Sequence, residues 1–508
     1  MLKPTLVLMC GRMMSFGATF VIPVVLARMF TQDEFGTYKQ LFLIYMTLYA
    51  ITQCGMAESL FYFLPRSPQK GGQYAFNSLI VLLLSAATCS AILIWKSNAV
   101  SELLGNSKLE QHILPLGLYL FFMTASAVVE IVMTSQQEFR RAALTYAGSD
   151  LLRAILLIFP VLVFRNVRGV MLGAVVFAIC RFSFTLLHLS RKYKRMFRPD
   201  AGLLRQQLAY ALPFQLAIVI EILQANFHQY AVSHSFDAAT FAIYSIGCLQ
   251  IPLVELLAAP AGNVMMVQMS RHIESGRDTE AVEMWRETTR KLCLILFPLF
   301  GLMLQSAQDV IVLLFTEKYV DSGPIFMIWS ATIVLATVQT DSAMRVYAQT
   351  RRLVVLNALR LGALIGLMHA FLSSFGLRGA VLITILSTVL YKALSLARLR
   401  RVMNVAIGDL LPWRHFAFVA GASLAALASG AIPYLAAPDL PVPYRLVLVG
   451  VMYTAAYIVL LWRFDIITPY ERMSLRNSVR ELAAKMHRIG KRQKQSKDEE
   501  PCVALSEY

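Results

Sequence analysis

Long apolar segments separated by short polar connections recur along the whole chain. A helix that crosses the hydrocarbon core of a bilayer needs about 20 mostly apolar residues, and segments of that length predict about fourteen spans. The predicted spans are residues 5–29, 39–64, 76–95, 112–135, 143–164, 168–190, 207–232, 238–267, 292–315, 323–348, 352–375, 378–398, 412–437 and 442–464. The pattern therefore predicts an all-α integral membrane protein with about fourteen transmembrane helices.

The composition argues against a soluble protein. Of the 508 residues, 57% are apolar and 15% are charged, whereas soluble domains are about 25% charged. The cysteines show no paired spacing, and most lie in apolar runs, as is typical of small buried hydrophobic residues. We therefore predict no disulfide framework, no metal site and no cofactor.

Basic residues are concentrated in alternate connections between the predicted spans. One set holds Arg66, Lys70, Arg140, Arg141, the run 191–198, the stretch 271–291, Arg351, Arg352, Arg398, Arg400, Arg401 and the C-terminal tail. Because cytoplasmic loops carry an excess of Lys and Arg, we expect this face and both termini to be cytoplasmic. This asymmetry accounts for most of the net charge of +17. Since the charges lie in short loops, we predict no nucleic-acid partner.

Two segments on the predicted cytoplasmic face are amphipathic. The stretch 271–291 is charged and helical in pattern. The tail after Pro469 places its apolar residues on one helix face: Leu475, Val479, Leu482, Met486 and Ile489. Arginines and lysines on the other faces suit a helix lying on an anionic membrane surface, and the alternative is a solvated helical tail.

A short internal echo indicates a duplication. Phe30, Phe35 and Tyr38 recur at the same offsets as Phe236, Phe241 and Tyr244, each time in a predicted extracytoplasmic turn. Such repeats are common in transporters. The predicted organisation is an N-terminal six-helix bundle (1–190), a basic linker (191–206), a C-terminal six-helix bundle (207–398), two further transmembrane helices (412–464) and a cytoplasmic tail (465–508).

Several degenerate motifs occur in an order typical of a known family. They are Leu26-Ala27-Arg28 with Phe35-Gly36-Thr37-Tyr38, Gly55 to Leu60 with Leu64-Pro65, Tyr210 to Pro213, Phe241 to Tyr244, and Leu314-Phe315 with Lys318-Tyr319. Over spans 1–12 the chain resembles the polysaccharide and oligosaccharide (O-antigen type) flippases of the multidrug/oligosaccharidyl-lipid/polysaccharide exporter superfamily. Thr316 departs from the family pattern, where glycine is more usual.

The resemblance implies two six-helix bundles around a central cavity that opens alternately to each side of the membrane. It implies a lipid-linked glycan as substrate, moved outward on a polyprenyl pyrophosphate, and membrane lipids as surroundings. By analogy it also implies the bacterial inner membrane and a polysaccharide polymerase of the same pathway as a partner.

Charged residues within the predicted spans are the candidate site residues, because each costs roughly 2.5–3.5 kcal/mol to insert. The basic set is Arg12, Arg153, Arg181, Arg345 and Arg360, and the acidic set is Glu58, Glu130, Asp150, Glu221, Glu255 and Asp341. Helical spacing lets Asp150 pair with Arg153 and Asp341 with Arg345.

Arg12, Arg181 and Arg360 have no local partner, so we expect them to hold the pyrophosphate, whose oxygens match the guanidinium fork. The alternative for Arg12 is snorkelling to the nearby interface. For Arg181 the alternative is a buried pair with a glutamate on another helix.

Two further transporter functions stay open. The acidic set could couple transport to cations or bind cationic drugs, as in the multidrug exporters of the superfamily, and the lipid II flippases share the fold. An enzyme is disfavoured, because the sequence has neither a large extramembrane loop nor a phosphate-binding glycine loop, zinc-binding helix motif or nucleophile turn.

Overall fold

The computed structural model describes residues 17, 19–194, 198–464 and 466, and this part of the chain is helical and contains no strand. Eleven of its helices are long and apolar enough to cross a membrane, or up to twelve if the bent pair α2 and α3 forms one span. The all-helical membrane fold is confirmed. The exact number of fourteen spans stays a prediction. The first half of the first span lies outside the described residues, and so does the whole of the predicted tail helix.

The first group of helices is called here the N-terminal bundle. It comprises the helix Thr19–Met29, α2 (Gln32–Thr52), α3 (Met56–Arg66), α4 (Gly71–Trp95), α5 (Ser97–Leu103), α6 (Glu110–Ala125), α7 (Val128–Ser135), α8 (Phe139–Phe164) and α9 (Val167–Tyr193). Thr31 and Glu34 form a capping box at the start of α2. Gly55, with φ of 65°, separates α2 from α3, and the two helices are bent by 40°.

The second group is called the C-terminal bundle, followed by two appended helices. It comprises α10 (Ala201–Ser235), α11 (Ala238–Gly247), α12 (Pro252–Glu274), α13 (Asp278–Phe315), α14 (Ser322–Trp329), α15 (Ala331–Ala336), α16 (Thr340–Val346), α17 (Thr350–Met403), α18 (Ile407–Leu410), α19 (Trp413–Ala436) and α20 (Val442–Arg463). The 54-residue α17 contains non-helical backbone at Gly376, between the predicted spans 352–375 and 378–398.

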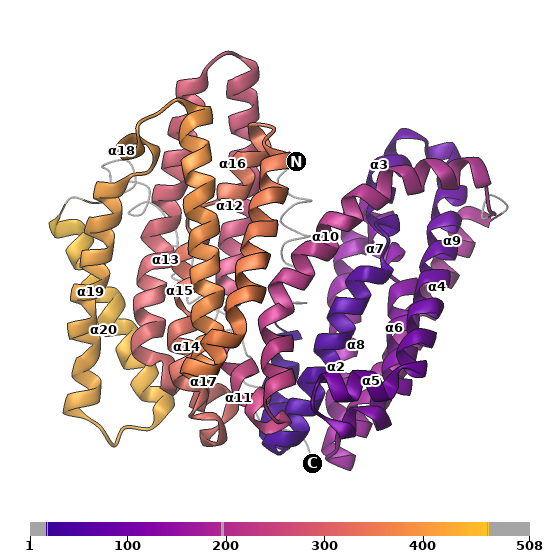
Figure 1. Cartoon of the computed structure of the whole chain (residues 1–508), viewed down its shortest axis with the longest axis horizontal. Coiled ribbons are helices and arrows are strands. Elements are labelled where there is room, and N and C mark those ends of the chain that lie inside the picture. The colour runs from indigo at the N-terminus through magenta and orange to yellow at the C-terminus, as the bar shows by residue number, and fades with distance from the viewer. Residues whose placement is uncertain (1–16, 18, 195–197, 465, 467–508) are drawn as a thin grey trace, which may run out of the picture.

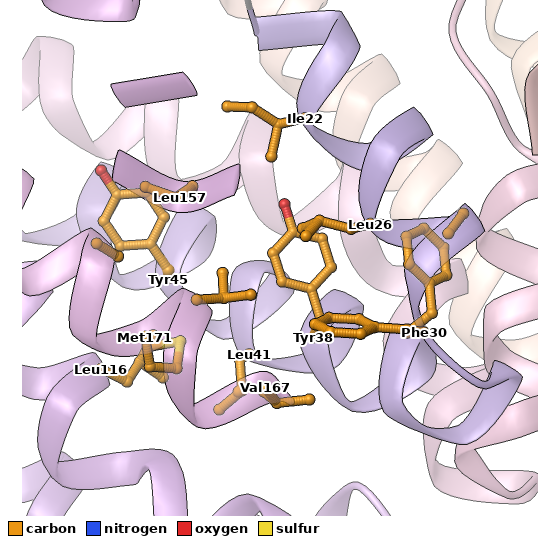
Figure 2. Close-up of a cluster of buried hydrophobic side chains, with 14 of the residues drawn as sticks. Ile22, Leu26, Phe30, Tyr38, Leu41, Tyr45, Leu116, Leu157, Val167 and Met171 are labelled. Atoms are coloured by element: carbon orange, nitrogen blue, oxygen red, sulfur yellow. The ribbon is translucent and has the colours of Figure 1, made fainter. Parts of the chain in front are cut away.

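The two bundles meet at the end of the molecule opposite the basic connections (Figure 1). There α2 packs against α11, and the Phe35 and Tyr319 rings meet edge to face with centroids 5.7 Å apart. Arg28 donates hydrogen bonds to the carbonyls of Leu313 and Leu314. We call this set of contacts the lock. One apolar core runs through it from the N-terminal bundle (Figure 2) into α11 and α13.

Helix α10 belongs to both bundles. Near its start, Gln207 donates hydrogen bonds to Ser59 and Ser78 of the N-terminal bundle. Towards its end, α10 packs on α17, and Gln224 donates a hydrogen bond to the Asn357 carbonyl. The helix therefore crosses from one bundle to the other (Figure 1).

The basic stretch 271–291 is helical, as its pattern indicates, but it continues the neighbouring spans. Gly276, with positive φ, forms the turn between α12 and α13. Trp285 is fully buried there and donates a hydrogen bond to the Leu410 carbonyl at 3.0 Å. Its apolar face packs against other helices of the same end, so it does not lie free as a surface helix.

Candidate functional site

An ion pair between two helices lies inside the N-terminal bundle. Arg181 of α9 contacts Glu130 of α7 at 2.7 Å, and their side chains are 16% and 3% exposed. Arg181 also donates hydrogen bonds to the hydroxyls of Ser126 and Ser149. The fold thus brings Arg181 to a glutamate on another helix, as in the alternative considered from the sequence.

The predicted pair on α8 is present in looser form. Arg153 and Asp150 are 3.9 Å apart, and Nε of Arg153 is buried without a hydrogen-bond partner. Arg153 and Arg181 thus face two acids, and Glu58 of α3 is a third acid in the same bundle.

A second charged group lies in the C-terminal bundle. Arg360 on α17 sits 5.9 Å from the Tyr391 ring centroid, and its Nε is buried without a hydrogen-bond partner. Tyr391 donates a hydrogen bond to Asp341 at 2.7 Å, and Lys392 donates one to the Val338 carbonyl. The charges of Asp341 and Glu221 attract the Arg360 guanidinium. Arg360 nevertheless forms no ion pair within 4 Å in the described part of the chain.

The predicted pair of Asp341 with Arg345 is not among the ion pairs of the described residues. Both lie on the short helix α16 and are exposed. Asp341 instead accepts hydrogen bonds from Tyr391 and Thr340. A partner from α17 thus replaces the one that helical spacing suggests, and Arg345 forms no ion pair within 4 Å among the described residues.

The remaining acidic candidates are dispersed. Glu58 is half-buried, and its Oε2 has no hydrogen-bond partner. Glu221 is exposed on α10, and Glu255 is exposed in a small cavity of about 220 Å³ that Gln250 and Trp329 also line. The described residues hold no cluster of three or more His, Cys, Asp or Glu suited to a metal. Arg12 lies outside them.

Several charged residues were missing from the predicted set, Lys392 of α17 among them. Asp309 of α13 forms a buried ion pair with Arg445 of α20 at 2.6 Å. Lys39 of α2 lies 5.6 Å from the Phe35 ring centroid, beside the lock. Asp309 and Arg445 each lie inside a predicted span, so the same rule that selected the others could have found them.

Membrane-length apolar helices that enclose charged side chains define a multi-pass membrane protein. The family model described as polysaccharide biosynthesis protein matches residues 25–324, which is more than half of the chain. The protein belongs to this family, and the family resemblance inferred from its motifs is confirmed. No curated protein sequence matches the chain.

Solved transporter structures share the fold at low identity. The lipid II flippase MurJ, in an inward closed conformation, is 12% identical and has a TM-score of 0.71, with 92% of this chain and 100% of MurJ covered. An inward-facing multidrug resistance transporter of the MATE family and MOP superfamily is 15% identical, with a TM-score of 0.62 and coverage of 77% and 95%. A MOP superfamily transporter from Pyrococcus furiosus is 14% identical, with a TM-score of 0.55 and coverage of 79% and 95%.

Proposed function

We propose that the protein is an alternating-access flippase. It moves a polyprenyl-pyrophosphate-linked oligosaccharide from the cytoplasmic to the outer leaflet for polysaccharide biosynthesis or export. Membership of the polysaccharide biosynthesis family supports this function. The fold shared with a lipid II flippase and with multidrug transporters supports the transport mechanism.

The observation that carries the proposal is the one-sided joining of the two bundles. The lock connects α2 with α11 and Phe35 with Tyr319 at one end, while the basic connections lie at the other (Figure 1). Orientation by the excess of basic residues makes that other end cytoplasmic. A lipid-linked glycan would then enter from the cytoplasmic side and leave when the lock opens.

Fixed positive charge is needed along such a route, because desolvating a pyrophosphate in hydrocarbon would be prohibitive. Arg360 and Arg345 are the best candidates for direct contact, since neither has an ion pair within 4 Å in the described residues. Arg153 and Arg181 already face Asp150 and Glu130, so we assign them to shaping the N-terminal bundle. Arg12 remains a candidate on the first predicted span.

The membrane potential favours export of this cargo. Moving one negative charge outward from a negative interior gains about 2.3 kcal/mol per 100 mV. We place the protein in the bacterial inner membrane with both termini in the cytoplasm, and propose a polysaccharide polymerase of the same pathway as its partner. No chemical step is required of the protein, which we propose is not an enzyme.

The test is mass spectrometry of the lipids that co-purify with the protein after gentle extraction from its native host. We expect a polyprenyl-pyrophosphate glycan, retained about tenfold less by Arg360→Gln because one charged hydrogen-bonding group is lost. Arg352→Gln, which removes an exposed arginine from the start of the same helix, is the matched control and should retain it.

Two other results would redirect the assignment. A peptide-bearing lipid II as the bound lipid would make the protein a lipid II flippase. Absence of any glycan lipid, together with export of cationic dyes that depends on Glu58 or Glu221, would make it a cation-coupled multidrug exporter and overturn the proposal.

A further inference from the structure

A cavity of about 900 Å³ opens on the N-terminal bundle, whose residues alone line it. It lies where α2, α6 and α9 begin, at the end opposite the basic connections. In the predicted orientation this is the depth of the outer-leaflet headgroups. The volume lies within the range of about 300–1,000 Å³ that is usual for small-molecule sites.

The lining of the cavity is divided into a polar end and an apolar wall. The polar end is formed by Asp33, Glu34, Lys108, Gln111, His112 and Arg168. The apolar wall consists of Leu114, Pro115, Leu118, Leu172 and Val175. Leu114 and Leu172 are 57% and 52% exposed, so the wall faces the hydrocarbon. A ligand that fits both parts is an amphiphile with a polar head and an alkyl chain.

Two side chains at the polar end could bind a phosphate. Arg168 is exposed and has no ion pair among the described residues, and Nδ1 of His112 is buried without a hydrogen-bond partner. Arg168 also lies in the first turn of α9, where the helix dipole favours an anion. A guanidinium at that position gains a partner when a phosphate binds.

The two carboxylates of the cavity, Asp33 and Glu34, favour a ligand that also carries a cationic group. Asp33 forms an ion pair with Lys108, and Glu34 accepts the capping hydrogen bond of Thr31. Each carboxylate can accept further hydrogen bonds. With Arg168, the lining holds two acids and two bases, so its formal charge is zero. A net anionic headgroup would give the occupied cavity a net negative charge, whereas a zwitterionic headgroup leaves its net charge at zero.

The cavity shares the first turn of α2 with the lock. Asp33, Glu34 and Thr37 face the cavity. On the other side of the same turn, Gln32 donates a hydrogen bond to the Lys318 carbonyl, and Phe35 packs on Tyr319. A ligand that holds Asp33 and Glu34 therefore holds the segment from which the lock is built.

We infer that this cavity binds an outer-leaflet phospholipid with a phosphoethanolamine headgroup. Arg168 and His112 take its phosphate, Asp33 and Glu34 take its ammonium group, and one acyl chain follows Leu114, Leu118 and Leu172. Bound lipid steadies the first turn of α2 and with it the lock. This inference concerns the membrane lipid around the protein and does not depend on the identity of the transported cargo.

The experiment is a titration of the purified full-length protein followed by native mass spectrometry. The probes are phosphatidylethanolamine, phosphatidylglycerol and phosphatidylcholine with identical acyl chains. We expect phosphatidylethanolamine to be retained best, because its ammonium group donates hydrogen bonds to carboxylates and its net charge is zero. Arg168→Gln should weaken its retention about tenfold. Arg165→Gln, which changes an exposed arginine just outside the cavity, should leave it unchanged.

Hydrogen exchange provides the second measurement. Phosphatidylethanolamine should slow exchange in residues 31–38 of the native protein and fail to do so in Arg168→Gln, while the other helices of that variant keep their protection. Equal retention of all three lipids, equal loss in both arginine variants, or preference for phosphatidylglycerol would overturn the inference. Displacement of phosphatidylethanolamine by the lipid-linked glycan would also overturn it, since the cavity would then belong to the cargo.

Discussion

Gly36 of α2 lies directly against the backbone carbonyl of Ala238 in α11, and a β-carbon added to Gly36 would overlap that carbonyl. The closeness of these two residues lets the two bundles join at the lock. Phe35 and Phe241, the neighbours of this contact in the two copies of the sequence echo, are both fully buried.

Gly36→Ala should force α2 and α11 apart, because neither backbone can yield as a flexible side chain would. Overpacking of this kind costs about 1–3 kcal/mol. In Gly36→Ala it destabilises the state in which α2 and α11 are in contact at the lock. Spin labels at the exposed positions 107 and 317 should report a longer or broader distance in this variant. Gly148→Ala is the control, since its β-carbon would meet nothing within 4 Å, and an unchanged distance in Gly36→Ala would contradict the prediction.

The pair of Glu130 with Arg181 should matter more for stability than an exposed pair. Glu130→Gln leaves a buried guanidinium without its carboxylate, and breaking a buried pair costs about 3–5 kcal/mol. Thermal unfolding in detergent should show this loss, part of which the double variant Glu130→Gln/Arg181→Gln should recover. Glu280→Gln, which breaks the exposed pair with Arg277, should cost under about 1 kcal/mol. Equal effects at the two sites would show that Glu130 is well solvated.

Asp309 and Arg445 should fasten the appended helices to the C-terminal bundle. Their ion pair joins α13 to α20, and Tyr434 of α19 donates a hydrogen bond to the same carboxylate at 3.0 Å. In Asp309→Leu both partners lose their acceptor, so amide hydrogens of α19 and α20 should exchange faster while those of α2 are unaffected. Uniformly faster exchange in all helices would instead indicate global destabilisation.

Glu138 should make the stability of the end that carries the basic connections depend on pH. Burial alone would raise the pKa of this carboxyl, but hydrogen bonds from Lys192 at 2.6 Å and Arg141 at 3.3 Å outweigh it and lower the pKa. A carboxyl with a lowered pKa stabilises the folded state above its ordinary pKa of 4.5 and loses this effect as the pH falls through the lower folded value. The stability difference between the native protein and Glu138→Gln should therefore be full at pH 7 and shrink below pH 4.5. A difference that grows on acidification would contradict this sign.

The helices could be predicted from the sequence because apolar segments of membrane length need no tertiary information. The boundaries at Trp95, Phe164 and Phe315 coincide with predicted span ends. The break at Gly55 was not predicted, since it depends on the approach of α10. An alanine side chain there would come within 2.7 Å of the Ala211 carbonyl.

The charged groups were predictable only where one helix determines them. Asp150 and Arg153 lie three residues apart on α8, and helical geometry brings them together. Glu130 and Arg181 required knowledge of how α7 and α9 pack. Asp341 accepts a hydrogen bond from Tyr391 of another helix. The four-residue spacing on α16 was therefore not sufficient to predict the partner of Asp341.

Helix α10 has a mechanical consequence. Its first half is tied to the N-terminal bundle by Gln207 and by Gln215, which donates a hydrogen bond to the Ala50 carbonyl of α2. Gln224 ties a later turn to α17. If the bundles rock against each other as rigid bodies, the residues between Gln215 and Gln224 must absorb the rotation. Pro213 lies two residues before that interval and removes a backbone hydrogen bond from the helix. The bending of the transport cycle thus falls within a single helix, next to a turn whose backbone is already weakened.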